Sequence, residues 1–306
     1  MLISVASGKG GTGKTTVAVN LFLSFSSTEW NEVASTRESD APRVQLLDCD
    51  VEEPNAHIFL KPEIKERRPV SLPVPLVDEN KCSHCGVCAE VCAFNAILAT
   101  NRRIMVFEEL CHGCGACSVF CPKGAISEKG RKIGVLETGL AKKGIFSHGI
   151  LNPGEAVAAP LISAVRNTAL GDGIVIIDSP PGTSCGMVGS VKGSDFCILV
   201  TEPTPFGFHD LQIAYEVTRK LMVPSGVVIN RSDIGDDRIE RFCQQSGIPV
   251  LLKIPFDRMI ARSYARGETL TERYPEYAEM FRELRHRILE ISRGNLKTGH
   301  AQGRPN

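Results

Sequence analysis

The segment GKGGTGKT, at residues 8–15, constrains the fold of this 306-residue chain more than any other feature. It follows an apolar run, LISVA (2–6), and precedes a segment with helical spacing at residues 16–25. In such a strand–loop–helix unit the glycines let backbone N–H groups turn inward, which creates a phosphate site at the helix N-terminus. The predicted nucleotide contacts are Gly8, Gly10, Gly11, Thr12, Gly13, Lys14, Thr15 and Thr16, with Lys14 on the β- and γ-phosphates and Thr15 on Mg²⁺.

Short, continuous apolar runs recur along the chain and predict the sheet around this loop. Runs without alternation are typical of parallel strands that are buried on both faces. Helical spacing at 209–222 and 276–291 predicts helices that cover the sheet. We therefore expect an α/β fold with a doubly wound, mostly parallel sheet. The predicted strands are LISVA, VQLLD (44–48), IVIID (174–178), CILVT (197–201), GVVIN (226–230) and PVLLK (249–253).

Two of these strands end in aspartate, and the carboxylates are expected to complete the nucleotide site. Asp178 ends IVIID, at a point where an aspartate commonly holds magnesium through water. The SPPG turn that follows puts Gly182 where its N–H could sense a γ-phosphate. After VQLLD, Asp48 and Asp50 point the same way if the chain stays extended. One of them could serve the magnesium shell and the other orient the attacking water, whereas the two glutamates that follow are interpreted as solvated.

Eight of the twelve cysteines form a repeat that interrupts the strand–helix pattern. CSHCGVCAEVCAFNAI (82–97) returns 29 residues later as CHGCGACSVFCPKGAI (111–126), and the strand-like IMV (104–106) returns as IGV (133–135). An inserted small domain explains the interruption. The predicted organisation is 1–78 and 136–292 for the two parts of the large domain, 79–135 for the insert, and 293–306 for a flexible tail.

Each repeat has the spacing C-x-x-C-x-x-C-x-x-x-C, which is typical of bacterial ferredoxins with two 4Fe–4S clusters. In that arrangement three cysteines bind one cluster and the fourth serves the other. Zinc is the alternative for C-x-x-C pairs, but it does not account for four cysteines per repeat. The predicted ligands are Cys82, Cys85, Cys88 and Cys121 for the first cluster, and Cys92, Cys111, Cys114 and Cys117 for the second.

The other four cysteines are expected to differ in role. Cys197 and Cys243 lie in apolar elements and are interpreted as buried. Alternation turns Cys49 inward as well. Cys185 comes just after the γ-phosphate turn, in PPGTSCG. A bridging or transient cluster at Cys185 is one hypothesis, and a buried structural thiol is the other.

Three motifs in order, KGGTGKTT, DCDVEEPN and DSPPGTS, resemble those of the deviant Walker-A ATPases of the MinD/ParA/Mrp family, which includes the nitrogenase iron protein. The resemblance covers the chain outside the insert. It implies that two subunits enclose two ATP molecules, and that the extra lysine of the loop, here Lys9, reaches the partner's phosphates as an arginine finger does. It also implies that Asp50 orients the attacking water and that Asp48 lies near the magnesium.

The NRSD segment (230–233) allows two interpretations of the base. Its spacing is like the guanine-reading N-K-x-D of GTPases, but arginine replaces the lysine. The resembling family has this asparagine, Asn230, beside adenine, and Pro255 and Phe256 are expected near the base too. We therefore expect ATP rather than GTP.

Composition restricts the partners and the compartment. The chain has 35 basic and 35 acidic residues, which argues against a general affinity for nucleic acid. No run approaches the roughly 20 apolar residues of a membrane span, so membrane insertion is not expected. The N-terminus has no signal-peptide pattern, and cysteines without one indicate metal or redox chemistry in the cytoplasm.

A nucleotide site and iron–sulfur ligands in one chain predict an ATPase that is stimulated by dimerisation or by a partner. We expect it to transfer electrons through its two clusters to an unidentified redox or iron–sulfur partner protein. It would act as a homodimer, or as a heterodimer with a related ATPase. The alternatives are an ATP-dependent cluster carrier or scaffold of the Mrp type, and a MinD/ParA-like switch whose clusters are structural or sensory.

Overall fold

The computed structural model describes residues 1–27, 43–142 and 144–299. Within these ranges nine strands form one sheet, in the order β11-β10-β9-β1-β8-β2-β7-β6-β3. Neighbouring strands from β11 to β7 are parallel, whereas β6 is antiparallel to both β7 and β3. The mostly parallel sheet is therefore confirmed. Its strands are β1 (Leu2–Ala6), β2 (Val44–Asp48), β3 (Glu63–Val77), β6 (Ile126–Ala141), β7 (Gly144–Leu151), β8 (Ile174–Asp178), β9 (Phe196–Thr201), β10 (Ser225–Asn230) and β11 (Val250–Ile254).

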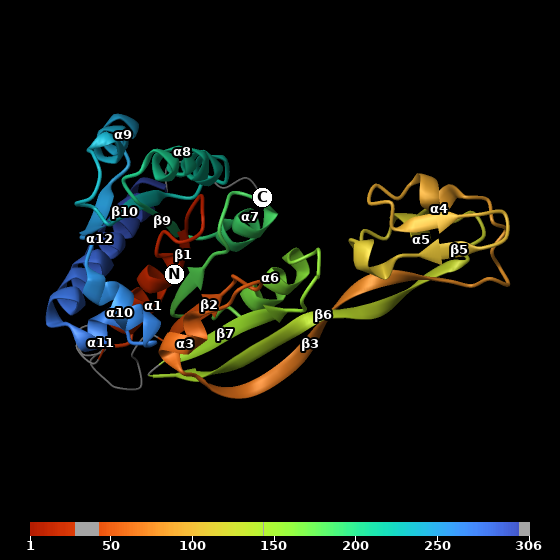
Figure 1. The fold of residues 1–306 in the computed structure, drawn as a ribbon, viewed down its shortest axis with the longest axis horizontal. Coiled ribbons are helices and arrows are strands. Elements are labelled where there is room, and N and C mark those ends of the chain that lie inside the picture. Colours follow the sequence, from red (N-terminus) through yellow and green to blue (C-terminus); the bar gives the residue numbers. More distant parts are fainter. Residues whose placement is uncertain (28–42, 143, 300–306) are drawn as a thin grey trace.

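Helices cover both faces of this sheet, as Figure 1 shows. On one face Phe22 and Phe281 are fully buried in a large apolar core with side chains of the central strands. The opposite face has two further cores, around Met187 and around Leu161. The first face carries α1 (Lys14–Phe25), α3 (Ala56–Leu60), α10 (Arg258–Ala265), α11 (Leu270–Arg273) and α12 (Pro275–Gly299); the second carries α6 (Ala159–Arg166), α7 (Cys185–Val191), α8 (Pro205–Lys220) and α9 (Arg238–Ser246).

The predicted strands match the observed ones to within a residue at each end. The observed helices are longer than the predicted ones. Helix α1 begins at Lys14 and α8 at Pro205, because glycine and threonine caps come before the apolar stripes do. Helix α12 continues to Gly299, so the first part of the predicted tail is helical rather than frayed. Residues 300–306 of that tail lie outside the described residues.

A long antiparallel hairpin, β3 with β6, leaves the large sheet and carries a small module at its far end (Figure 1). We call residues 78–125, between these two strands, the cysteine module. The inner part of β6 pairs with β7, with Val135 opposite Ile150. The segment IGV (133–135) therefore belongs to the large sheet, and the prediction that it repeats IMV inside the insert is wrong. The start of the insert at residue 79 and the other domain boundaries stay predictions.

The cysteine module repeats its own backbone. Two short helices follow glycines in the left-handed region, Gly86 at φ 83° and Gly115 at φ 74°, where a side chain would be strained. The side chains of Ile97 and Ile104 are buried in one apolar cluster together with Cys88. The elements are α4 (Val87–Glu90), β4 (Ile97–Ala99), β5 (Ile104–Val106), the 3₁₀ turn η2 (Glu108–Leu110) and α5 (Ala116–Val119).

Candidate functional site

A cleft of about 430 Å³ opens where the phosphate loop meets the ends of several parallel strands. Carboxyl ends of parallel strands are the usual place for a ligand in such sheets. The predicted residues that line it are Gly10, Gly11, Gly13, Lys14, Thr15, Thr16, Asp50, Asn230, Pro255 and Phe256. The structure therefore brings the loop, one acidic strand end and the expected base-side residues together.

Gly8, Thr12 and Gly182 do not line this cleft, although they were predicted to contact the nucleotide. Gly8 lies so close to α8 that a Cβ there would collide with the backbone oxygen of Asp210. The N–H of Gly182 donates to the Ser7 carbonyl at 3.2 Å, so it faces the loop itself. These residues shape the loop from behind.

Asn230 links the two sides of the cleft. Its side-chain Nδ2 donates to the Thr12 carbonyl at 2.9 Å. A Cβ on Gly13, which has φ 99°, would lie 2.6 Å from that same nitrogen. Glycine is required at this position because the backbone is left-handed and the amide packs directly on it. Asn230 therefore positions the phosphate loop as well as lining the cleft.

Carboxylates surround the Lys14 ammonium, and burial changes how readily all of them ionise. Asp48 and Asp178 are fully buried and lie opposite each other on β2 and β8. Burial raises the pKa of Asp178 to about 7 and that of Asp50 to about 6, and it raises the pKa of Asp48 as well. Burial lowers the pKa of Lys14, although the three carboxylates oppose that change. The site thus resists ionisation of its carboxyl groups, and a bound cation would favour their charged form.

Asp178 fits a role in holding magnesium. Both of its carboxylate oxygens are buried, and the Thr15 side chain lies close enough to oppose the rise in its pKa. Asp48 differs, because it accepts hydrogen bonds from the backbone N–H groups of Asp50, Asn55 and Ala56 at 3.1 Å. No three His, Cys, Asp or Glu side chains converge on one ion anywhere in the described ranges. Magnesium at a nucleotide needs few of them, because it takes phosphate oxygens and water as ligands.

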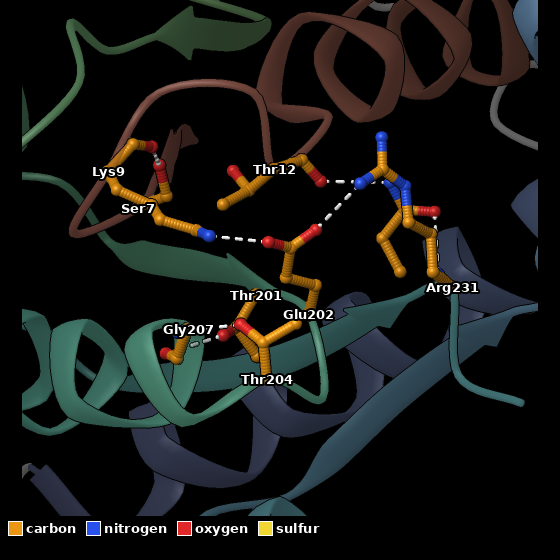
Figure 2. A network of polar contacts seen from close by, with 9 residues as sticks. Ser7, Lys9, Thr12, Thr201, Glu202, Thr204, Gly207 and Arg231 are labelled. Carbon is orange, nitrogen blue, oxygen red and sulfur yellow. Dashed lines mark hydrogen bonds and ion pairs between the residues drawn. The ribbon is translucent and has the colours of Figure 1, made fainter. Parts of the chain in front are cut away.

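Lys9 forms an ion pair within its own chain. Its Nζ contacts Oε1 of Glu202, the residue that follows β9, as Figure 2 shows. The other oxygen of Glu202 accepts from Arg231 at 2.9 Å. Neither Glu202 nor Arg231 was predicted. Arg231 also lines the cleft, and its place directly after the predicted Asn230 was the available signal.

A row of polar side chains crosses the sheet from the nucleotide site to the long hairpin. Asp178, Asp48, His148, Glu137 and Arg67 are successive register partners on β8, β2, β7, β6 and β3. The His148 ring bonds Glu137 at 2.8 Å, and Arg67 forms an ion pair with the same carboxylate. Burial lowers the pKa of His148 despite Glu137, so the neutral imidazole donates through Nε2. The row joins the magnesium-side aspartates to the base of the hairpin.

Four cysteines of the module line one small hollow: Cys92, Cys111, Cys114 and Cys117. The hollow thus joins the last cysteine of the first repeat with the first three of the second. His112 stacks on Phe94 beside the hollow, with ring centroids 3.6 Å apart.

The remaining cysteines of the two runs do not line this hollow. Cys82 and Cys121 pack against Cys88 in one cluster, and Cys85 is exposed. Backbone N–H groups donate to sulfur at equivalent places in the two repeats, from Ala96 to Cys92 and from Ala125 to Cys121, both at 3.3 Å. Such bonds stabilise thiolates.

The four cysteines outside the repeats divide as the sequence predicted, with one exception. Cys49, Cys197 and Cys243 are buried. Cys185 is exposed at the first residue of α7 and lines a hollow with Arg166. The interpretation of Cys185 as a buried thiol is therefore wrong, because the helix begins there and turns it outward.

The family of the chain follows from its sequence as a whole. Residues 3–270 match the model of the CobQ/CobB/MinD/ParA nucleotide binding domain. The chain belongs to this family. It is 31% identical over 295 residues to the uncharacterized protein MJ0579 of Methanocaldococcus jannaschii. That alignment covers 95% of this chain and 96% of the relative. A second protein of that organism, MJ0578, is 29% identical over 303 residues and covers 95% of this chain and 97% of its own length.

Solved structures show the same fold. The septum site-determining protein MinD of Pyrococcus horikoshii, complexed with Mg-ADP, has a TM-score of 0.57 at 18% identity, and the alignment covers 95% of this chain and 96% of that one. The cell division ATPase MinD of Pyrococcus furiosus has a TM-score of 0.55 at 19% identity, with 95% and 98% covered. In the described part of this chain, the helices are too short or too polar to span a membrane.

Proposed function

We propose that this chain is an ATPase that couples closure of a nucleotide-bound dimer to electron transfer through two 4Fe–4S clusters in the cysteine module. One observation carries the proposal. The hollow that joins Cys92 to Cys111, Cys114 and Cys117 groups the same four thiols that the ferredoxin spacing assigns to one cluster. Neither half of the repeat provides that set alone.

The nucleotide half of the proposal uses the cleft. Lys14 neutralises the β- and γ-phosphates, and Thr15 and Asp178 hold the magnesium, for which the buried Asp178 carboxylate beside Thr15 is suited. Asp50, whose pKa is raised to about 6 by burial, orients the attacking water. Asn230, Pro255 and Phe256 form the adenine side. Lys9 acts on the partner's phosphates, so turnover depends on a homodimer or on a heterodimer with a related chain.

The redox half uses the cysteine thiolates. Clusters of this type supply one-electron transfer at low potential when bound, and N–H···S bonds to their ligands tune that potential. The sulfurs that hold a four-iron cube each bind a separate iron, so they do not converge on one point as the ligands of zinc do. All twelve cysteines are free thiols, which suits a reducing cytoplasm.

The long hairpin supports coupling between the two halves. It joins the module to the large sheet, and the polar row from Asp178 to Arg67 ends on it. A change in charge at the magnesium site alters the field on Asp48 and His148, which are adjacent in that row. The row therefore connects the nucleotide site to the base of the hairpin, whose far end carries the module.

Exposed Cys185 favours a second candidate, an iron–sulfur carrier of the Mrp type. The thiol lies at the surface beside the nucleotide-side turn, where a labile cluster could be held between two subunits. The eight cysteines of the module argue for permanent clusters instead. We therefore place electron transfer first.

The test is an anaerobic redox titration of the iron-loaded protein, followed by EPR with and without Mg·ATP, with iron counted before and after turnover. A shift of cluster potential with iron retained supports ATP-coupled electron transfer. Unchanged potentials with iron lost during turnover support the carrier. Absence of both effects leaves a MinD/ParA-like switch with structural or sensory clusters.

Two sets of variants control this experiment. Lys14→Ala removes the phosphate contact, so ATP should no longer move the potentials while both cluster signals persist. Cys92→Ser should damage the cluster bound by Cys111, Cys114 and Cys117, whereas Cys121→Ser should damage the other. Damage to the same cluster in both variants would contradict the exchange of the fourth cysteine between repeats.

A further inference from the structure

Glu202 is a buried carboxylate with two cationic partners. Its side chain is 9% exposed, while those of Lys9 and Arg231 are 29% and 44% exposed. Each carboxylate oxygen is used by one cation, Oε1 by Lys9 and Oε2 by Arg231 (Figure 2). The carboxylate therefore bridges the phosphate loop and the turn after β10.

The backbone around Glu202 is rigid. Strand β9 ends at Thr201, and Thr204 caps α8 by accepting from the Gly207 N–H at 3.0 Å. The Glu202 carbonyl accepts from the Thr204 N–H at 2.7 Å, and a Cβ on Gly207 would collide with it. A capped helix and a buried strand thus fix where the carboxylate stands.

The two cations differ in how they are held. Arg231 lies in the left-handed region at φ 53°, and its N–H bonds the Oδ1 of Asn230 at 3.0 Å. A non-glycine residue keeps such a conformation only where its surroundings enforce it. Lys9 lies on the glycine-rich loop with a long flexible side chain, and its own carbonyl accepts from Ser7 Oγ. Lys9 is therefore the partner that can leave.

Departure of Lys9 does not leave Glu202 without a counterion. A buried carboxylate that loses its only cation is strongly disfavoured. Here Arg231 still occupies the second oxygen, so the carboxylate stays paired. The three residues form an element with two arrangements, one with Lys9 on Glu202 and one with Lys9 free to contact another anion.

We propose that Glu202 is a positioning residue that holds Lys9 in the monomer and releases it to the partner's nucleotide when the dimer closes. This inference rests on the proposed action of Lys9 across the dimer. A triphosphate with its several negative charges can outcompete one carboxylate, whereas a diphosphate competes less well. Glu202 thereby makes closure depend on ATP in the partner subunit, and it acts as the element that discriminates ATP from ADP.

The experiment compares the iron-loaded wild type with Glu202→Gln, Lys9→Ala and the double variant. Sedimentation velocity gives the dimer dissociation constant with ATP and with ADP, and turnover is measured at a concentration where the wild type is mostly monomeric. Glu202→Gln keeps the shape but frees Lys9. It should tighten the ATP dimer and raise this turnover by about fivefold, the low end of coupling between sites. It should also allow dimers with ADP.

The double variant separates the two proposals. If Glu202 acts through Lys9, the substitution Glu202→Gln has no effect on dimerisation in the Lys9→Ala background. An equal effect in both backgrounds, or a weaker ATP dimer in Glu202→Gln, overturns the inference. If Lys9→Ala alone leaves turnover and dimerisation at wild-type levels, the action of Lys9 across the dimer is what fails.

A variant that is expected to weaken the ATP dimer excludes misfolding as the explanation of the effects. Arg231→Gln leaves Lys9 as the sole cation on the carboxylate, so Lys9 should be held more tightly and the ATP dimer should weaken by about fivefold. Adding Glu202→Gln to Arg231→Gln should restore the dimer. Absence of that rescue, in a protein with normal thermal unfolding, contradicts the proposed exchange.

Discussion

The large sheet and the cysteine module bury their side chains to different extents. Phe22, Phe146 and Phe281 are fully buried in the sheet cores, whereas Ile97 and Ile104 of the module are each 6% exposed. The module also leaves large apolar side chains at its surface, with Val119 at 80% and Phe120 at 61% exposure. A unit of about 50 residues rarely buries enough apolar surface to fold alone.

The difference shows what stabilises each region. Apolar burial on two faces supports the sheet, and it leaves room for costly charges such as the three aspartates around Lys14. The module has few buried isoleucines and eight thiols, and in the proposed function bonds from sulfur to iron supply the rest. On that proposal, function costs stability in the sheet and creates it in the module.

Removal of iron should have the largest effect, because it should unfold the module and leave the sheet folded. Chelation under anaerobic conditions is expected to unfold residues 78–125 and leave the sheet intact, because only the module depends on sulfur–iron bonds. Hydrogen exchange should show loss of protection in α4, β4, β5 and α5, with unchanged ATP binding. Full protection of the module after removal of iron would show that its apolar core is sufficient.

Two core truncations test whether the sheet and the module unfold separately. Phe22→Ala should lower the free energy of global unfolding by about 3–5 kcal/mol, because the ring is fully buried against β7, where a Cβ on Gly144 would approach it. Ile104→Ala should cost about 2 kcal/mol and affect only local opening of the module. Denaturant unfolding and hydrogen exchange measure the two effects. Equal loss of protection in both regions from either variant would argue for one cooperative unit.

The smallest effect concerns the charges of the nucleotide site. The pKa of Asp178 is raised from 3.8 to about 7 in the fold, so the magnesium-free protein loses stability as the pH rises between these two values; the loss is partial at pH 5 and complete above about pH 7. Asp178→Asn should therefore stabilise the magnesium-free protein by about 2 kcal/mol at pH 8 and by less at pH 5. Thermal unfolding at the two values of pH, with the substitution Asp172→Asn at an exposed position as a control, measures it. The same gain at both would contradict the burial argument.

Much of the fold was predictable because its signals are local. Continuous apolar runs predicted the parallel strands apart from β7, where Ser147 and His148 interrupt the apolar pattern, and the glycine-rich segment between a run and a helix predicted the phosphate loop. The hairpin of β3 and β6 was not predicted. Its strands are exposed along much of their length and carry charges and prolines, so no apolar run marks them. The assignment of IGV to the insert failed for the same reason, because β6 continues without a break from module to sheet.

The candidate site divides in the same way. Lys14, Thr15, Asp50 and Asn230 follow from motifs, because each stands at a fixed distance from a strand end. The contact of Lys9 with Glu202 joins residues that are 193 positions apart, and no spacing rule connects them. It arises because β9 lies beside β1 in the sheet, which puts the two strand ends next to each other.

Residue type and short spacing were enough to predict a phosphate loop and two runs of regularly spaced thiols. Which distant groups meet follows from the tertiary fold instead. The pairing of Lys9 and Arg231 with one carboxylate, the row from Asp178 to Arg67, and the grouping of Cys92 with the second repeat all depend on strand order and chain reversal. Those are set by burial of the whole sheet and module, which no local segment encodes.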